Sequence, residues 1–256
     1  MMSFLVTATL QSQLKGDAAV LYKQAQAGKF YGQAANLNPT IQPATNGKTF
    51  SVIWKSTPKP EKWIVSIHGS HGFATDDLAI WHQNLGDRKV GIVAVQWWLG
   101  HGDNDYLTPK EVYQEISATL KSLNVKPQTC MFHGFSRGSA NSFPIVAEDA
   151  TSDRFFSLAV ASSGRANVGY PPVRSIIQGG YGDHPLKGTK WVTSAGKNEP
   201  NPERDGIEGM RATANWLKEQ GATVVMQIED ETAGHGALQT NPANAKKLLD
   251  LFLDSD

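Results

Sequence analysis

The sequence contains almost no cysteine, because Cys130 is the only one among its 256 residues. A single thiol excludes an intramolecular disulfide and a zinc site built from several thiolates. One cysteine is compatible with a reducing cytosol, and equally with a secreted protein that folds without a disulfide. The cysteine content therefore leaves the compartment open.

The sequence also lacks an excess of either charge, since 24 lysines and arginines face 24 aspartates and glutamates. Proteins that bind nucleic acids usually carry a basic surface, so no nucleic-acid partner is expected. No run of about twenty apolar residues is present, so we expect no membrane span. The oligomeric state has no comparable signature in the sequence and stays open.

The first sixteen residues, MMSFLVTATLQSQLKG, have a short apolar run but no basic segment before it and no small-residue cleavage site after it. They are not typical of a signal peptide. A chain from which a leader had been removed would begin in the same way, so the localisation stays open between cytoplasm and secretion.

The sequence does contain enough apolar residues, 40%, for one sizeable core. Residues 10–30 have the apolar spacing of an amphipathic helix, which we interpret as part of an N-terminal helical extension over residues 1–40. Asn46-Gly47 lies between two strand-like runs and indicates a hairpin. No linker or repeat is visible, so we predict a single domain over residues 1–256.

After the hairpin, short β-rich runs alternate with helical stretches. The six runs are KWIVSIHG, VGIVAVQWW, TCMFHGFS, FFSLAVASSG, KWVTSAGK and TVVMQIED. This alternation predicts an α/β fold, with a mostly parallel sheet of about eight strands flanked by helices. The segment between the sixth and seventh strands, residues 165–189, is too short for a large lid domain.

The motif Gly134-Phe135-Ser136-Arg137-Gly138 lies at the end of the fifth predicted strand and before a helix. A serine in G-x-S-x-G between a strand and a helix occupies a tight, strained turn that exposes its hydroxyl. We therefore predict Ser136 as a nucleophile. A chance match in a glycine-rich loop is the alternative, which the flanking strand and helix make much weaker.

A serine nucleophile needs a base to take its proton. His235 follows the eighth predicted strand, in a glycine-flanked loop before the final helix, and is our candidate for that base. A developing oxyanion needs backbone N–H donors. The donors predicted are those of Arg137, directly after the serine, and of Ser70 in the loop HGSHG, with His71 as the alternative to Ser70. A metal site on His68 and His71 lacks a recognised ligand spacing, so no metal is expected.

Taken in order, HGSHG, GFSRGS, AGKNEPN and AGHGAL resemble the motifs of the α/β-hydrolase fold superfamily, from about Ile41 to the C-terminus. The compact layout is similar to feruloyl-esterase and polyhydroxyalkanoate-depolymerase relatives. The resemblance implies a triad acid after the seventh strand, where the family usually has aspartate and this chain has Glu199. We favour Glu199 by position and keep Asp205, a possible helix cap, as the alternative. Asp230 lies too close to His235 in its own strand.

Ligands of open α/β sheets bind beyond the carboxyl ends of the strands. Trp97, Trp98 and Tyr106 follow the fourth predicted strand at that end, and we predict that they and His71 contact the substrate. The alternation of side chains along a strand places at least one of the two tryptophans in the core.

These features together predict a serine hydrolase of small carboxylic esters that works through an acyl-enzyme and needs no cofactor. Two alternatives stay open: a serine peptidase or amidase of the same fold, and a catalytically silent binding module.

Overall fold

The structure is a computed structural model that describes residues 14–254. Its strands are β1 (Thr40–Pro43), β2 (Phe50–Lys55), β3 (Lys62–Ile67), β4 (Val90–Val95), β5 (Cys130–Phe135), β6 (Phe156–Ser162), β7 (Lys190–Gly196) and β8 (Thr223–Asp230). Its helices are α2 (Gly16–Ala25), α3 (Tyr31–Asn36), α4 (Ala74–Leu85), α5 (Pro109–Ser122), α6 (Arg137–Thr151), α7 (Pro171–Ile177), α8 (Ile207–Glu219), α9 (Ala237–Thr240) and α10 (Pro242–Asp254).

The eight strands form one sheet in the order β1-β2-β4-β3-β5-β6-β7-β8. The β1–β2 and β2–β4 pairs are antiparallel, and the pairs from β4 through β3, β5, β6 and β7 to β8 are parallel. The predicted α/β fold with a mostly parallel sheet of eight strands is therefore confirmed. The hairpin predicted at Asn46-Gly47 is the β1–β2 pair.

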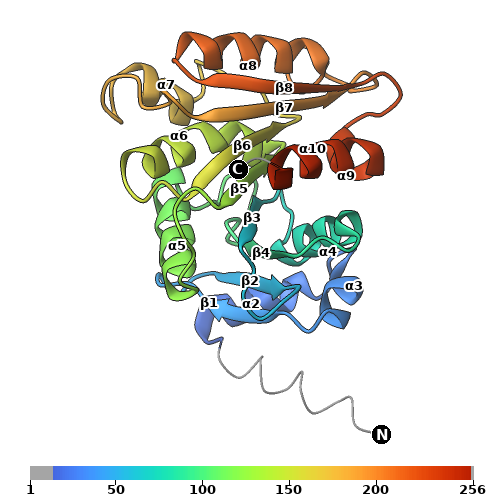
Figure 1. The fold of residues 1–256 in the computed structure, drawn as a ribbon. Helices are drawn as coiled ribbons and strands as arrows, with labels where there is room; N and C mark the ends of the chain where they lie inside the picture. The colour runs from blue at the N-terminus through green and yellow to red at the C-terminus, as the bar shows by residue number, and fades with distance from the viewer. Residues whose placement is uncertain (1–13, 255–256) are drawn as a thin grey trace, which may run out of the picture.

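Helices cover both faces of the sheet, which explains why the inner strands are almost continuously apolar. Figure 1 shows α5, α6 and α7 on one side of the sheet and α4, α9 and α10 on the other. A hydrophobic core lies on each face of the sheet, and alternate residues of one strand point into different cores. Val65 packs in the core under α5–α8, whereas Ile64 packs in the core under α4 and α10. No helix within residues 14–254 is both long enough and apolar enough to cross a membrane.

The helix predicted over residues 10–30 is only partly seen, since residues 10–13 lie outside the described part. Helix α2 spans Gly16–Ala25 and ends before Phe30. A turn around Gly28 separates it from α3, with the Gly28 N–H donating to the carbonyl of Ala25 at 2.9 Å. The apolar spacing was therefore right for α2 and wrong about its end. The apolar side of α2 packs against Phe50 and Ile41 of the hairpin.

Candidate active site

The turn between β5 and α6 has the backbone geometry expected of the G-x-S-x-G motif, and Ser136 is half-buried there. Ser136 follows the last residue of β5 and precedes the first residue of α6, with φ 53° and ψ −114°. A positive φ is unusual for a residue with a side chain and marks a strained turn. The turn is held in place because the Ser136 N–H donates to the Ser162 carbonyl of β6 at 2.8 Å.

The two glycines of the motif are required by close backbone approaches. A Cβ on Gly134 would lie 2.5 Å from the carbonyl oxygen of Gly138, so the helix crosses the strand with no room for a side chain. A Cβ on Gly138 would lie 2.6 Å from the carbonyl oxygen of Ile67, at the end of β3. The motif is therefore a structural requirement of this strand–helix crossing.

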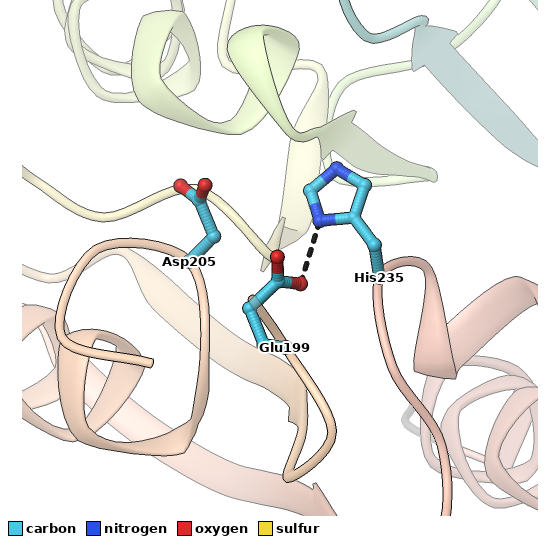
Figure 2. Close-up of side chains that lie close together, drawn as sticks. All are labelled: Glu199, Asp205 and His235. Atoms are coloured by element: carbon cyan, nitrogen blue, oxygen red, sulfur yellow. Dashed lines mark hydrogen bonds and ion pairs between the residues drawn. The ribbon is translucent and has the colours of Figure 1, made fainter. Parts of the chain in front are cut away.

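His235 lies beside this turn and contacts a buried glutamate. Its Nδ1 is 2.7 Å from Oε2 of Glu199, whose side chain is only 4% exposed, against 38% for His235. Figure 2 shows the other ring nitrogen of His235 facing away from Glu199. The His235 ring also packs against the ring of Phe135, next to Ser136 in the chain, with centroids 4.9 Å apart. The hydrogen bonds of residues 14–254 include none between His235 and Ser136.

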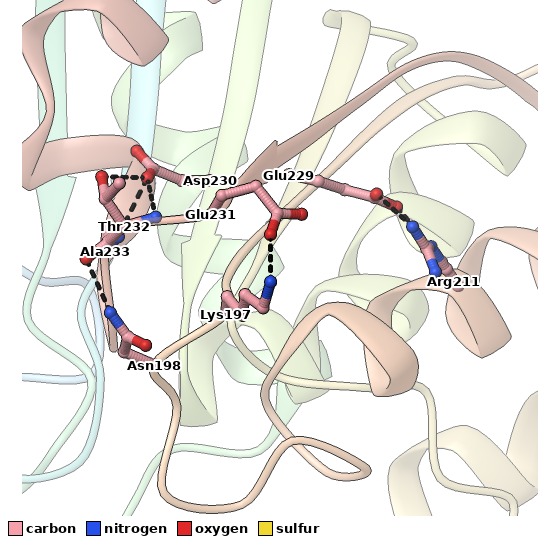
Figure 3. A network of polar contacts seen from close by, with 8 residues as sticks. All are labelled: Lys197, Asn198, Arg211, Glu229, Asp230, Glu231, Thr232 and Ala233. Atoms are coloured by element: carbon pink, nitrogen blue, oxygen red, sulfur yellow. Dashed lines mark hydrogen bonds and ion pairs between the residues drawn. The ribbon is translucent and has the colours of Figure 1, made fainter.

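The loops that carry Glu199 and His235 are bonded to each other. The N–H of Lys197 donates to the Asp230 carbonyl at 2.8 Å, and that of Asn198 donates to the Ala233 carbonyl at 2.9 Å. The side chain of Asn198 also donates to the Thr232 carbonyl at 2.8 Å. Figure 3 shows this contact region, including the Lys197–Glu231 ion pair. The main chain thus fixes the loop of the acid to the loop of the histidine.

Asp230 organises the histidine loop and does not contact His235. Its Oδ1 accepts hydrogen bonds from the N–H groups of Thr232 and Ala233, and its Oδ2 accepts them from the side-chain amides of Asn241 and Asn244. These donors hold the pKa of Asp230 well below its ordinary value, with Asn241 making the largest contribution. Asp230 therefore connects the end of β8 to the start of α10.

Asp205, the alternative acid, differs from the prediction of a helix cap. The N-cap of α8 is Gly206, and the Asp205 side chain makes no capping bond there. Its Oδ2 accepts a hydrogen bond from Nε of Arg204 at 2.6 Å. The cap prediction was wrong because the 201–205 segment forms a turn before α8, and Figure 2 shows Asp205 beside Glu199 and His235, with a bond drawn only between those two.

Glu199, Asp205 and His235 bring their polar atoms within 4.8 Å of one another, a spacing that could hold a metal ion. The Arg204 guanidinium on Asp205 adds a positive charge to this group, and Nδ1 of His235 already contacts Glu199. Both features favour a hydrogen-bonded acid–histidine pair over a cation site.

In the HGSHG loop, the Ser70 N–H is available as a donor and the His71 N–H is not. The N–H of His71 donates to the Tyr106 hydroxyl at 2.9 Å, which occupies the alternative donor. No hydrogen bond is found for the Ser70 N–H, and Ser70 lines a cavity together with Ser136 and Arg137. In the same loop, burial lowers the pKa of His68 to about 4. His68 is therefore neutral and donates from Nδ1 to the Gly69 carbonyl at 2.8 Å.

The aromatic residues predicted to contact the substrate pack against one another and against the HGSHG loop. Trp97 is 1% exposed and donates from Nε1 to the His68 carbonyl, so it is the tryptophan of the pair that belongs to the core. The ring of Tyr106 packs against Trp97, and that of Trp98 packs against His71, with centroids 4.4 and 5.2 Å apart. None of these four side chains lines the cavity.

The cavity beside Ser136 has a volume of about 390 Å³, within the range of small-molecule sites. It includes three residues that sequence reasoning missed, Arg165, Tyr170 and Arg204. Arg165 follows the carboxyl end of β6, and a search of every strand end for polar side chains would have found it. Arg204 and Tyr170 lie in irregular segments with no such signal.

No protein-family model and no curated protein matches the chain. Among solved structures, an esterase from Pyrobaculum calidifontis has a TM-score of 0.62 at 14% identity, covering 99% of this chain and 97% of that one. An arylesterase has a TM-score of 0.63 at 12% identity, covering 97% of each chain. An acylaminoacyl peptidase from Pyrococcus horikoshii has a TM-score of 0.54 at 14% identity, covering 80% of this chain and 38% of that one.

The sheet order, the strand–serine–helix turn and these whole-length similarities agree with one another. The chain has the α/β-hydrolase fold.

Proposed function

We propose that the chain is a serine hydrolase that cleaves carboxylic esters through an acyl-enzyme. The observation that carries this proposal is the 2.7 Å contact between Nδ1 of His235 and the buried carboxylate of Glu199, beside a serine on a strained turn. A carboxylate in this position holds the imidazole in one tautomer and stabilises the imidazolium that forms during reaction. The fold similarity to esterases supports the same activity.

In the proposed mechanism, Nε2 of His235 removes the proton from Ser136 Oγ as that oxygen attacks the ester carbonyl. The His235–Ser136 hydrogen bond would form in the substrate complex, since such bonds are often long in the free enzyme. Collapse of the tetrahedral intermediate transfers the proton to the leaving alcohol and leaves Ser136 acylated. Water then attacks this acyl group and gives its proton to His235, which releases the acid and restores Ser136.

We assign the oxyanion donors to the backbone N–H groups of Arg137 and Ser70. Arg137 is the first residue of α6, so its N–H has no partner within the helix. Ser70 is favoured over His71 because the His71 N–H is bonded to Tyr106. The helix N-terminus adds a partial positive charge that favours a negative oxygen. No cofactor takes part in this mechanism.

We also propose that the whole chain is one hydrolase domain, with residues 1–40 as an N-terminal extension. In the described part of that extension, Leu21 and Ala25 belong to the core beneath α4.

The experiment is turnover of 4-nitrophenyl butanoate by the native protein, by Ser136→Ala and by a control variant, Ser122→Ala. Ser122 is exposed at the end of α5, where its hydroxyl bonds only the Thr119 carbonyl. Ser136→Ala should lose activity by several orders of magnitude with an unchanged melting temperature, and Ser122→Ala should retain it. Equal turnover by native protein and Ser136→Ala would contradict the proposal. A matched anilide tests the amidase alternative, which the similarity to an acylaminoacyl peptidase favours.

A further inference from the structure

The cavity beside Ser136 is lined by three arginines, Arg137, Arg165 and Arg204, and by a single acid, Asp205. The chain as a whole has equal numbers of basic and acidic side chains, so this local excess of positive charge is not a property of the entire surface. We call this space the arginine cavity.

The single acid does not neutralise the three arginines. Asp205 is engaged by Arg204, with Nη2 and Oδ2 2.6 Å apart. Glu199, which lies next to Asp205, is engaged by His235. Two guanidinium groups, those of Arg137 and Arg165, are therefore left without a carboxylate partner among the described residues.

Arg137 is fixed by neutral groups. Its Nη1 donates to the Asp103 carbonyl at 2.6 Å, and its guanidinium lies 4.6 Å from the centre of the Tyr106 ring. Stacking on an aromatic ring and a bond to a carbonyl hold the side chain in place without cancelling its charge. The positive charge is thus retained at the cavity wall.

Arg165 retains an unused donor as well as its charge. Its Nη1 donates to the Glu203 carbonyl at 3.0 Å, whereas its Nε is shielded from solvent and has no hydrogen-bond partner. A buried donor without an acceptor is unfavourable, and such groups call for a ligand or a bound water. A guanidinium presents its N–H groups as a planar fork that matches the oxygens of a carboxylate or phosphate.

We propose that the arginine cavity binds an oxyanion group of the substrate, so that the preferred esters are small molecules bearing a carboxylate or phosphate near the ester bond. This inference rests on the proposed esterase function. Arg165 would bind the anion directly, and Arg137 would contribute its fixed positive charge. A purely apolar acyl chain would leave both guanidiniums desolvated and unpaired, which is unfavourable.

The experiment compares kcat/KM for mono(4-nitrophenyl) glutarate with that for its neutral methyl ester. A second pair, 3-(butanoyloxy)benzoate and its methyl ester, places the charge on the alcohol side. A third pair, 4-nitrophenyl 4-phosphonobutanoate and its neutral dimethyl phosphonate ester, tests phosphate-like chemistry. The charged member of at least one pair should be preferred about ten- to hundredfold, which corresponds to one charge-assisted hydrogen bond.

Arg165→Gln should abolish that preference by raising KM for the charged ester. Arg165→Lys, which keeps the charge and loses the fork, should retain part of it. The matched control is Arg154→Gln, which removes the same charge from an exposed side chain bonded only to the Ala150 carbonyl. This control should keep the native preference. Equal kcat/KM for charged and neutral esters in all pairs would overturn the anion site and leave the esterase function standing.

Binding of glutarate, 3-hydroxybenzoate and 4-phosphonobutanoate, measured by calorimetry, separates the two proposals. If no ester is turned over but one of these anions binds native protein and not Arg165→Gln, the anion site stands and the esterase proposal fails. If no ester is turned over and none of the anions binds, both proposals fail.

Discussion

The two halves of the candidate site are built in different ways. The serine elbow, residues 134–138, is defined by backbone approaches, such as the 2.5 Å that would separate a Gly134 Cβ from the Gly138 carbonyl. The acid–histidine loops, residues 197–205 and 230–235, are defined by hydrogen bonds, such as those of Asp230 to Thr232 and Asn241. The conformation of the elbow is therefore determined by steric contacts, and that of the loops by hydrogen bonds.

This difference has consequences for how each half fails. The elbow has no room for an added atom at its glycines, but its shape does not depend on the polar groups of the surrounding side chains. The acid–histidine loops have room for small changes in side-chain shape, but their conformation depends on each hydrogen-bond donor and acceptor. Substitutions that are conservative in one half should be damaging in the other.

Among substitutions that compare the two halves of the site, the largest effect is expected from an isosteric change in the acid–histidine loops. Glu199→Gln keeps the shape but presents an amide to His235, so the histidine is no longer held by a carboxylate, and kcat should fall by about 10³ to 10⁴. Asp205→Asn is the matched control, since its carboxylate is bonded to Arg204. It should reduce kcat less than about tenfold. If Asp205→Asn were inactive and Glu199→Gln active, Asp205 would be the acid of the triad.

The next largest effect is expected from one methyl group in the serine elbow. Gly134→Ala forces the strand and helix apart and should lower the free energy of unfolding by about 3 kcal/mol or more. Gly32→Ala is the control, because nothing lies within 4 Å of its added Cβ in helix α3. This control should be neutral or slightly stabilising. Equal denaturant midpoints for the two variants would show that the elbow is not sterically closed.

Much of the elbow could be predicted from sequence because its determinants are adjacent in the chain. Gly134, Ser136 and Gly138 lie within five residues, and the structure has the expected strand before and helix after. His235 and Glu199 could be placed only by their positions after β8 and β7. The choice between Glu199 and Asp205 depends on which carboxylate reaches an imidazole 30 or more residues away, which no local pattern specifies.

The cavity was the least predictable part of the site. The bulky aromatics Trp97 and Trp98 suggested a pocket wall, but Trp97 packs inward as a core residue. The actual lining includes Arg204, whose position depends on the irregular turn before α8. The backbone bonds of this turn are local, but no pattern in residues 201–205 indicates that the Arg204 side chain lines a cavity beside Ser136.

A smaller effect, on stability rather than activity, is expected beneath the elbow. Asp77 of α4 accepts a 2.6 Å hydrogen bond from Ser66, which also contacts His133 of β5. Burial raises the pKa of Asp77 to about 7, so the folded protein keeps a proton that the unfolded chain releases above pH 4. The stability from this group is therefore lost as pH rises from about 4 to 7.

Asparagine at position 77 cannot titrate, so the free energy of unfolding of Asp77→Asn should not fall with pH in this way. Between pH 5 and pH 8, the native protein should lose about 2 kcal/mol more than the variant in urea unfolding. Burial lowers the pKa of His133 to about 3, so below about pH 6.5 the unfolded chain binds a proton that the folded protein does not. The native protein and Asp77→Asn should lose stability equally from this group as the pH falls. Parallel stability curves for the two proteins would show that Asp77 does not bind a proton in this range.

The smallest effect is expected from loosening the histidine loop without touching its catalytic groups. Asp230→Asn replaces one acceptor oxygen by a donor, which breaks the pattern of bonds to Thr232, Asn241 and Asn244. Asp230 acts here as a positioning residue, so kcat should fall about tenfold with KM unchanged. Glu229→Gln breaks only the exposed pair with Arg211 and should change neither constant. A rise in KM alone would contradict the positioning role.

The proposed triad of Ser136, His235 and Glu199 is tested most directly by the site and rate of labelling with a fluorophosphonate, followed by mass spectrometry of the labelled peptide. This reagent traps a serine made nucleophilic by a base, so it reports on both halves of the site without a choice of substrate. We expect a single adduct on Ser136 in native protein and in Asp205→Asn, formed at least about a hundredfold more slowly in Glu199→Gln. An adduct on another serine, or equal rates in native protein and Glu199→Gln, would contradict the proposed triad.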